Sequence, residues 1–116
     1  MEFPLVSILV PMYNAAGCIT RCVESLCSQT YKSIEILLLN DGSTDETHDR
    51  IIRAFGLYKI EHNMKISIPT KEVRGVYFNA EYPNLIYVDK ENGGKSDALN
   101  AGINMSEYQL FVCLDA

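Results

Sequence analysis

Two short apolar runs on either side of an amphipathic stretch constrain the fold of this chain most strongly. The runs are PLVSILVP at 4–11 and IEILLLN at 34–40. Such runs are typical of strands that are buried on both faces of a sheet. Between them, apolar residues recur at helical spacing, and Asn14 is a candidate N-cap for this helix. A strand, a helix and a second strand in this order predict a right-handed parallel unit.

The same alternation continues to the end of the chain. Ser43 and Glu46 have the spacing of a capping box, which predicts a second helix whose buried stripe includes Phe55. Further strands are predicted at 57–62, 84–89 and 109–114, and a further helix is predicted over 93–105 with Ala98, Leu99, Gly102 and Ile103 on one side. This order predicts an α/β fold with a mostly parallel, doubly wound sheet and helices on both faces.

The segment 64–83 departs from this alternation. Apolar residues alternate only weakly around Pro69 and the pair Arg74-Gly75. The pattern predicts an inserted hairpin.

Length and charge limit the classes of function. The chain has 116 residues, which fits a single domain, and its 15 acidic and 10 basic side chains give a net charge of -5. Because non-specific nucleic-acid binding depends on positive charge, nucleic acid is not an expected partner. No apolar run reaches the length of a membrane span, and the first residues lack the basic start of a signal peptide, so we expect a cytoplasmic location.

Four cysteines occur in the chain, at Cys18, Cys22, Cys27 and Cys113. The first three fall within one helical pattern and the fourth follows much later, a spacing that fits neither a disulfide framework nor a zinc site. We therefore expect all four to be small buried apolar residues.

Polar clusters follow four of the predicted strands: PMYNAA, NDGSTD, KENGGK and LDA. Ligands of parallel α/β sheets bind beyond the carboxyl ends of the strands. The four loops are therefore expected to converge on one crevice.

Each cluster has both a binding interpretation and a plainer one. Asp41, followed by Gly42 and Ser43, offers a fixed acceptor for a base imide or a ribose hydroxyl, but the same residues suit a tight turn. Lys95 follows two glycines and could bring a positive charge to a diphosphate or a base, or could be a solvated surface lysine. Tyr13 could pack along a base, or could cover the sheet edge.

Asp115 comes directly after an apolar strand, where a metal-diphosphate complex would need oxygen ligands. One carboxylate is weak evidence for such a site.

Taken together and in order, the segments VSILVPMYNAAGCITRCVESLCSQTY, EILLLNDGSTDET, NGGKSDALNAG and LDA resemble the nucleotide-sugar-binding, Rossmann-like half of a family 2 glycosyltransferase of the GT-A fold. The resemblance covers nearly the whole chain apart from the segment 64–83. It implies transfer of a sugar from a nucleotide-sugar donor, expected to be a UDP-sugar, to an acceptor hydroxyl with inversion.

The resemblance also implies roles for individual residues. Pro11, Tyr13 and Asn14 would line the nucleotide, Asp41 with Gly42 and Ser43 would face the uracil, and Lys95 would contact the base or the diphosphate. Asp115 would be the first carboxylate of a D-x-D motif that binds a divalent metal, Mg or Mn. The catalytic base would lie beyond Ala116, so no catalytic residue is assigned here.

In this interpretation the chain is a single truncated domain, 1–116, that lacks the acceptor-binding half and is inactive alone. Apolar surface at the missing half would then allow self-association. The combination of segment 64–83 with ENGGKSDALNAG resembles the branch that contains processive polysaccharide synthases. This resemblance implies a glycan or polysaccharide acceptor and a parent protein that is membrane-associated through segments not present in this chain.

Other classes remain as alternatives. A dinucleotide-binding dehydrogenase would carry G-x-G-x-x-G after the first strand, where this chain has only Gly17, and a nucleotidyltransferase would carry a Gly-rich basic loop there. A non-catalytic domain that binds nucleotide or protein with the same fold is the remaining alternative.

Overall fold

Strands and helices alternate in the order that the apolar runs predict. The computed structural model describes residues 6–28, 33–62, 66–106 and 110–114. The elements are β1 (Val6–Met12), α1 (Ile19–Cys27), β2 (Ile34–Asp41), α2 (Thr47–Phe55), β3 (Tyr58–Ile60), β4 (Val73–Phe78), β5 (Leu85–Lys90), α3 (Lys95–Met105) and β6 (Leu110–Cys113).

The six strands form one sheet in the order β3-β4-β5-β2-β1-β6. The pairs β1/β2, β1/β6 and β2/β5 are parallel, whereas β4 runs antiparallel to both β3 and β5. The predicted mostly parallel sheet is therefore confirmed. Because the chain builds outward from β1 through β2 and then returns to the other side of β1 with β6, the topological switch point lies between β1 and β6.

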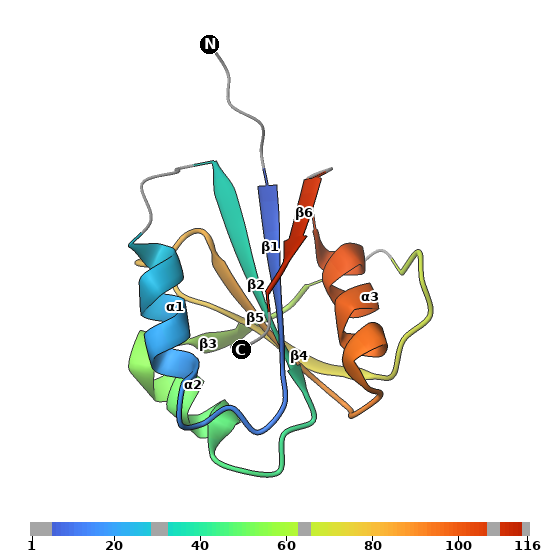
Figure 1. Ribbon diagram of the computed structural model, residues 1–116, viewed down its shortest axis with the longest axis horizontal. Coiled ribbons are helices and arrows are strands. Elements are labelled where there is room, and N and C mark those ends of the chain that lie inside the picture. The colour runs from blue at the N-terminus through green and yellow to red at the C-terminus, as the bar shows by residue number, and fades with distance from the viewer. Residues whose placement is uncertain (1–5, 29–32, 63–65, 107–109, 115–116) are drawn as a thin grey trace.

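Helices cover both faces of the sheet (Figure 1), as predicted. Successive side chains of a strand point to opposite faces. Ile8 and Val10 of β1 accordingly join the core under α1 and α2, while Leu9 joins the core under α3. The central strands are thus buried on both sides, which explains why their sequences are apolar with little alternation.

Helix α1 buries Ile19, Val23 and Leu26 against the sheet, at helical spacing. Residue Cys18 occupies its N-cap position and makes no side-chain capping bond. The prediction that Asn14 caps this helix is therefore wrong, because the helix begins four residues later than that cap requires.

The prediction that the four cysteines are buried is also wrong. Cys18, Cys27 and Cys113 are exposed, and Cys22 is half-buried. The cysteines of α1 lie on the flanks of its buried stripe, and Cys113 belongs to β6, whose four residues are all exposed.

Helix α2 begins at Thr47, and its N-cap residue Glu46 makes no side-chain capping bond, so the predicted capping box is absent. Asp45 instead bonds to the first residue of the helix. Its Oδ1 accepts hydrogen bonds from the backbone N of Thr47 at 2.9 Å and from the Thr47 hydroxyl. Ser43 cannot serve as the cap because its N and Oγ both bond to Asn40 Oδ1.

Helix α3 packs very closely on the sheet. Its buried residues are Ala98, Ala101, Gly102 and Met105, whereas Ile103 is exposed, so the buried face includes only part of the side that the sequence pattern grouped together. A Cβ at Gly102 would lie 2.7 Å from Leu39 Cδ1. The small residues therefore allow the helix axis to approach β1 and β2.

The segment 64–83 contributes a strand to the main sheet. Within it, β4 pairs with β3 on one side and with β5 on the other, and Val76 is buried in the core under α3. The predicted hairpin thus pairs β4 of this segment with β3, which lies just before it, and β4 also pairs with β5.

No helix in the described part of the chain has the length and apolar character needed to cross a lipid bilayer.

Candidate functional site

The loops that follow β1, β2 and β5 meet at the carboxyl edge of the sheet. Asp41, the last residue of β2, pairs in register with Lys90, the last residue of β5. Asn14 lies just after β1 and bonds to the loop that follows β2. Three of the four predicted loops therefore converge. The fourth contains Asp115, which lies outside the described residues, although Leu114 N still bonds to Leu9 O at 2.9 Å.

Asn14 holds the loop after β2 in place. Its backbone has φ 51°, and its Oδ1 accepts bonds from Thr44 N at 2.8 Å and Asp45 N at 3.3 Å. Asparagine tolerates this left-handed conformation better than most residues do. The next residue extends the junction, because Ala15 N donates to the hydroxyl of the buried Thr47 at 2.9 Å. The two loops are thus one connected unit.

The other predicted residues of these loops differ in exposure. Ser43 is half-buried and its Oγ also accepts a bond from Asn14 N at 3.0 Å, while Pro11 is buried within β1. Tyr13 is 52% exposed. Among these three side chains, only Tyr13 therefore presents a large surface to solvent.

Asp41 is buried and surrounded by donors from the loop after β5. Its Oδ1 accepts bonds from Lys90 Nζ at 2.6 Å and Gly93 N at 2.9 Å, and its Oδ2 accepts one from Gly94 N at 2.9 Å. Asn92 Nδ2 binds the Asp41 carbonyl at 2.8 Å. The diglycine is therefore folded around the carboxylate, with its two N–H groups directed at Asp41.

Lys90 is fully buried, which the sequence did not reveal. Its Nζ contacts Asp41 Oδ1 at 2.6 Å, Asp97 Oδ2 at 2.7 Å and the Glu91 carbonyl at 2.6 Å. These contacts use all three donors of an ammonium group. Buried lysines occur almost only when they are paired in this way. Asp41, Lys90 and Asp97 are called the buried triad below.

Asp97 lies in the first turn of α3 and ties this helix to the segment before β4. Its carboxylate accepts bonds from Lys71 N at 3.1 and 3.2 Å as well as from Lys90. Burial alone would raise the pKa of Asp97, but the hydrogen bonds from Lys90 and Lys71 outweigh it, and the net pKa is lowered.

The lowered pKa of Asp97 predicts a specific acid sensitivity. Since the folded state holds the proton less tightly than the unfolded state, Asp97 stabilises the fold fully above its ordinary pKa of about 3.9 and loses this effect as pH falls through the lower, folded value. In urea unfolding series from pH 6 down to about pH 2, the free energy of unfolding should fall more steeply for the wild type than for Asp97→Asn. Parallel curves would contradict this.

A second buried cluster lies beside the loop after β2, on the face covered by α2. Asn40 Nδ2 donates to the hydroxyl of Tyr87 at 2.8 Å, and this hydroxyl is hydrogen-bonded to His48 Nδ1 at 2.7 Å. Burial raises the pKa of Tyr87, and the bond from Asn40 only partly offsets this rise. The cluster ties β2, β5 and α2 together at the carboxyl edge, and no pattern in the sequence indicates it.

Tyr87→Phe should lower the free energy of unfolding by about 1–3 kcal/mol, because the buried Asn40 amide would lose its acceptor. Tyr58→Phe is the matched control, since Tyr58 is 51% exposed on β3 and should change stability by less than about 0.5 kcal/mol. Urea unfolding followed by circular dichroism measures both. Equal effects in the two variants would rule out the proposed role of the hydroxyl.

Two predicted contacts concern the diphosphate. Lys95 is the first residue of α3 and is exposed. Asp115 lies outside the described residues, and within the described ranges no group of three His, Cys, Asp or Glu side chains is placed to hold a metal ion. The described residues do not by themselves fit a metal site, so no chemical step is assigned to a metal.

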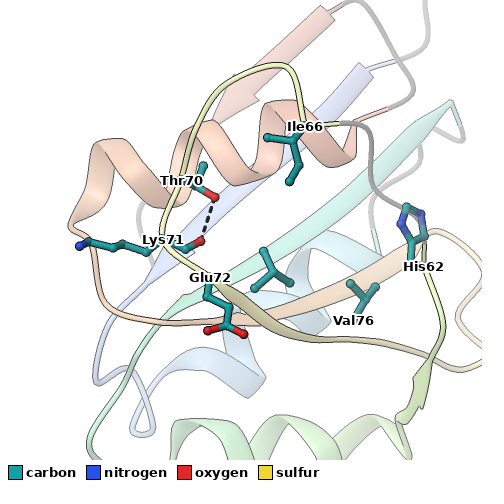
Figure 2. A pocket seen from close by; sticks show the side chains of 7 residues that line it. His62, Ile66, Thr70, Lys71, Glu72 and Val76 are labelled. Carbon is teal, nitrogen blue, oxygen red and sulfur yellow. Dashed lines mark hydrogen bonds between the residues drawn. The ribbon is translucent and has the colours of Figure 1, made fainter.

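A pocket with a volume of about 450 Å³ lies between β4 and the connection that precedes it (Figure 2). Thr70 Oγ1 donates to the Lys71 carbonyl at 2.9 Å at its edge. None of the site residues that the sequence predicts lines this pocket. Its wall consists of His62, Ile66, Thr70, Lys71, Glu72, Val73 and Val76. The candidate site is therefore the carboxyl edge of the sheet, where three loops are joined by hydrogen bonds.

Comparisons with known proteins show which family the chain belongs to. The model of glycosyl transferase family 2 matches residues 7–64, half of the chain, from β1 through the loop after β2 and beyond. An uncharacterized glycosyltransferase of Rickettsia prowazekii is 35% identical over 93% of this chain, which spans 26% of that relative.

A chondroitin synthase and a hyaluronan synthase of Pasteurella multocida are each 34% identical, over 99% and 97% of this chain. The chain spans 9% of the length of each, and about a quarter of the Rickettsia relative. These two synthases agree with the predicted resemblance to the synthase branch. Because the family model matches half of its residues, the chain belongs to glycosyl transferase family 2.

Proposed function

We propose that this chain forms the donor-nucleotide site of a glycosyltransferase that moves a sugar from a UDP-sugar to a hydroxyl of a glycan or polysaccharide acceptor, with inversion. The observation that carries the proposal is the convergence of three loops around Asp41 at the carboxyl edge of the sheet. This edge is where parallel α/β sheets bind their ligands, and the loop after β1 borders the topological switch point.

The base contact would be Asp41. Among the described residues its Oδ2 accepts one bond, from Gly94 N, and each carboxylate oxygen can accept about two. One acceptor position of Oδ2 therefore remains for the imide N–H of uracil. Gly42 and Ser43 would shape the wall beside it.

Tyr13 would pack along the base. Its ring is half exposed at the end of β1, and base stacking on an aromatic side chain contributes about 1–3 kcal/mol. Asn14 would act by holding in place the loop that contains Tyr13 and Asn14. Pro11 would lie beneath these two residues.

Lys95 would meet the diphosphate. It stands at the N-terminal end of α3, where the helix dipole also favours negative charge. Asp115 would add a carboxylate for a divalent ion, Mg or Mn, but no step of this proposal depends on that ion. No residue of this chain is assigned as the catalytic base, so the proposed function of the chain is donor binding.

The polysaccharide acceptor is proposed because two of the relatives are named as a chondroitin synthase and a hyaluronan synthase. A cytoplasmic location of this domain is part of the proposal. Strand β6 exposes Leu110, Phe111 and Val112, with 42–50% of each residue accessible, and such a strand edge supports self-association.

Calorimetric titration with UDP tests the site. Tyr13→Ala should weaken UDP binding about tenfold or more, because each 1.4 kcal/mol corresponds to about a factor of ten. Tyr58→Ala is the matched control, since Tyr13 and Tyr58 are 52% and 51% exposed but Tyr58 lies on β3, away from these loops. The control should change the affinity less than about twofold.

Titrations should be run at concentrations where sedimentation shows a monomer, so that self-association does not obscure the affinity. Equal weakening by Tyr13→Ala and Tyr58→Ala would contradict the site. Absence of UDP binding to the folded wild type would favour a protein-interaction domain instead.

A further inference from the structure

The buried triad contains Asp41, the proposed base contact, together with Lys90 and Asp97. Lys90 has no exposed surface, and the side chains of Asp41 and Asp97 are 7% and 18% exposed. Lys90 bridges the two carboxylates at 2.6 and 2.7 Å. Its third donor goes to the Glu91 carbonyl at 2.6 Å. The ammonium group therefore has no donor left for a ligand and can act only through the two carboxylates.

The triad fixes the orientation of the Asp41 carboxylate. Lys90 Nζ and Gly93 N both bind Oδ1, while Gly94 N binds Oδ2. Rotation of the carboxylate would break all three bonds. In this orientation one acceptor position remains, on Oδ2, and it can receive a single outside donor.

Asp97, which binds Lys90, is itself held in place by two parts of the chain. Asp97 belongs to α3, and its carboxylate also accepts bonds from Lys71 N at 3.1 and 3.2 Å. Lys90 therefore cannot follow Asp41 if that carboxylate moves. Asp97 thus resists rotation of Asp41 without contacting the base position.

A fixed acceptor discriminates between pyrimidines. The ring N3 of uracil carries a hydrogen and can donate to a carboxylate. The ring N3 of cytosine carries a lone pair, which would face the carboxylate oxygen with no hydrogen between them. Sites that hold a buried hydrogen-bonding group in place reject ligands that leave it unpaired.

We infer that Lys90 and Asp97 are positioning residues that make the Asp41 site select uracil over cytosine. This inference rests on the proposed donor-nucleotide function. When Asp97 no longer holds Lys90 against Asp41, the Asp41 carboxylate can turn and accept a bond from the exocyclic amino group of cytosine. The preference for uracil then falls.

A purely structural triad makes a different prediction. Loss of stability reduces the folded fraction, which lowers the apparent affinities for UDP and CDP by the same factor. The ratio of the two affinities would then stay constant. The ratio therefore separates positioning from stabilisation.

The test measures dissociation constants for UDP and CDP by calorimetry on the wild type, Asp97→Asn, Lys90→Met and Lys59→Met. Asp97→Asn keeps the shape of the side chain but weakens its hold on Lys90. Lys59→Met is a control on the exposed strand β3. Circular dichroism identifies a temperature at which each variant is folded.

We expect the wild type and Lys59→Met to prefer UDP by about tenfold or more, and this preference to fall below about threefold in Asp97→Asn and Lys90→Met. An unchanged ratio in the folded variants, or equal binding of UDP and CDP by the wild type, would overturn the inference and leave the proposed function standing. If Lys90→Met does not fold, Asp97→Asn decides. A folded wild type that binds neither nucleotide would overturn both proposals.

Discussion

Lys90→Met should lower the free energy of unfolding by about 3–5 kcal/mol, the typical cost of removing one partner of a buried ion pair. The methionine fills most of the same volume, but it leaves the carboxylates of Asp41 and Asp97 buried without their shared cation. Unpaired buried charge is far more costly than a lost hydrogen bond between neutral groups.

Urea unfolding at neutral pH measures the effect, with Lys59→Met as the control. Lys59 is exposed on β3, so its replacement should change stability by less than about 0.5 kcal/mol. The triple variant Asp41→Asn, Lys90→Met, Asp97→Asn should be more stable than Lys90→Met alone, because no unpaired charge remains. Similar stability of Lys90→Met and Lys59→Met would show that the triad is not a buried ion-pair network.

Gly42→Ala should be the second most damaging substitution, with two separate causes. Gly42 has φ 67°, a left-handed conformation that costs a residue with a Cβ about 1–3 kcal/mol. A Cβ there would also lie 2.6 Å from Asn92 N, a backbone atom that cannot move aside easily. Overpacking of this kind adds about 1–3 kcal/mol. The strain falls on the contact between the loops after β2 and β5.

Gly17→Ala is the matched control for this change. Gly17 lies in the loop after β1, and a Cβ there would meet no atom within 4 Å. Its replacement should leave the midpoint of thermal unfolding nearly unchanged, while Gly42→Ala should lower it clearly. If both alanine variants melted at the wild-type temperature, the close approach of Asn92 to Gly42 would be refuted.

The sequence predicted the layers of the fold better than their details. Runs such as the one ending at Asn40 are apolar because both faces of their strands are covered, and that pattern can be read without a structure. The position of a helix start cannot be read so easily. Asn14 and Ser43 are good capping residues by type, but neither caps a helix. Asn14 Oδ1 instead accepts a bond from the loop after β2, and the Ser43 hydroxyl bonds to Asn14 N and to Asn40. Tertiary hydrogen bonds thus replaced the predicted local ones.

The candidate site, too, could be predicted from the sequence only in part. The convergence of Asn14, Asp41 and the diglycine followed from the rule that parallel strands end at one edge. The burial of Lys90 did not follow, because lysine is normally a surface residue and only its register opposite Asp41 makes burial tolerable. Asp97 contacts Lys90 from another element. Such partners become visible only once strand register and helix placement are known.

A backbone-amide NMR titration with UDP tests the central claim most directly. If the loops after β1, β2 and β5 form a donor-nucleotide site, UDP should shift the amide resonances of residues 12–14, 41–43 and 93–96, and leave those around β3 unchanged. Shifts confined to the pocket beside β4, at residues 66–73, or no shifts in a folded, monomeric sample at millimolar UDP, would contradict the claim that these loops bind the donor nucleotide.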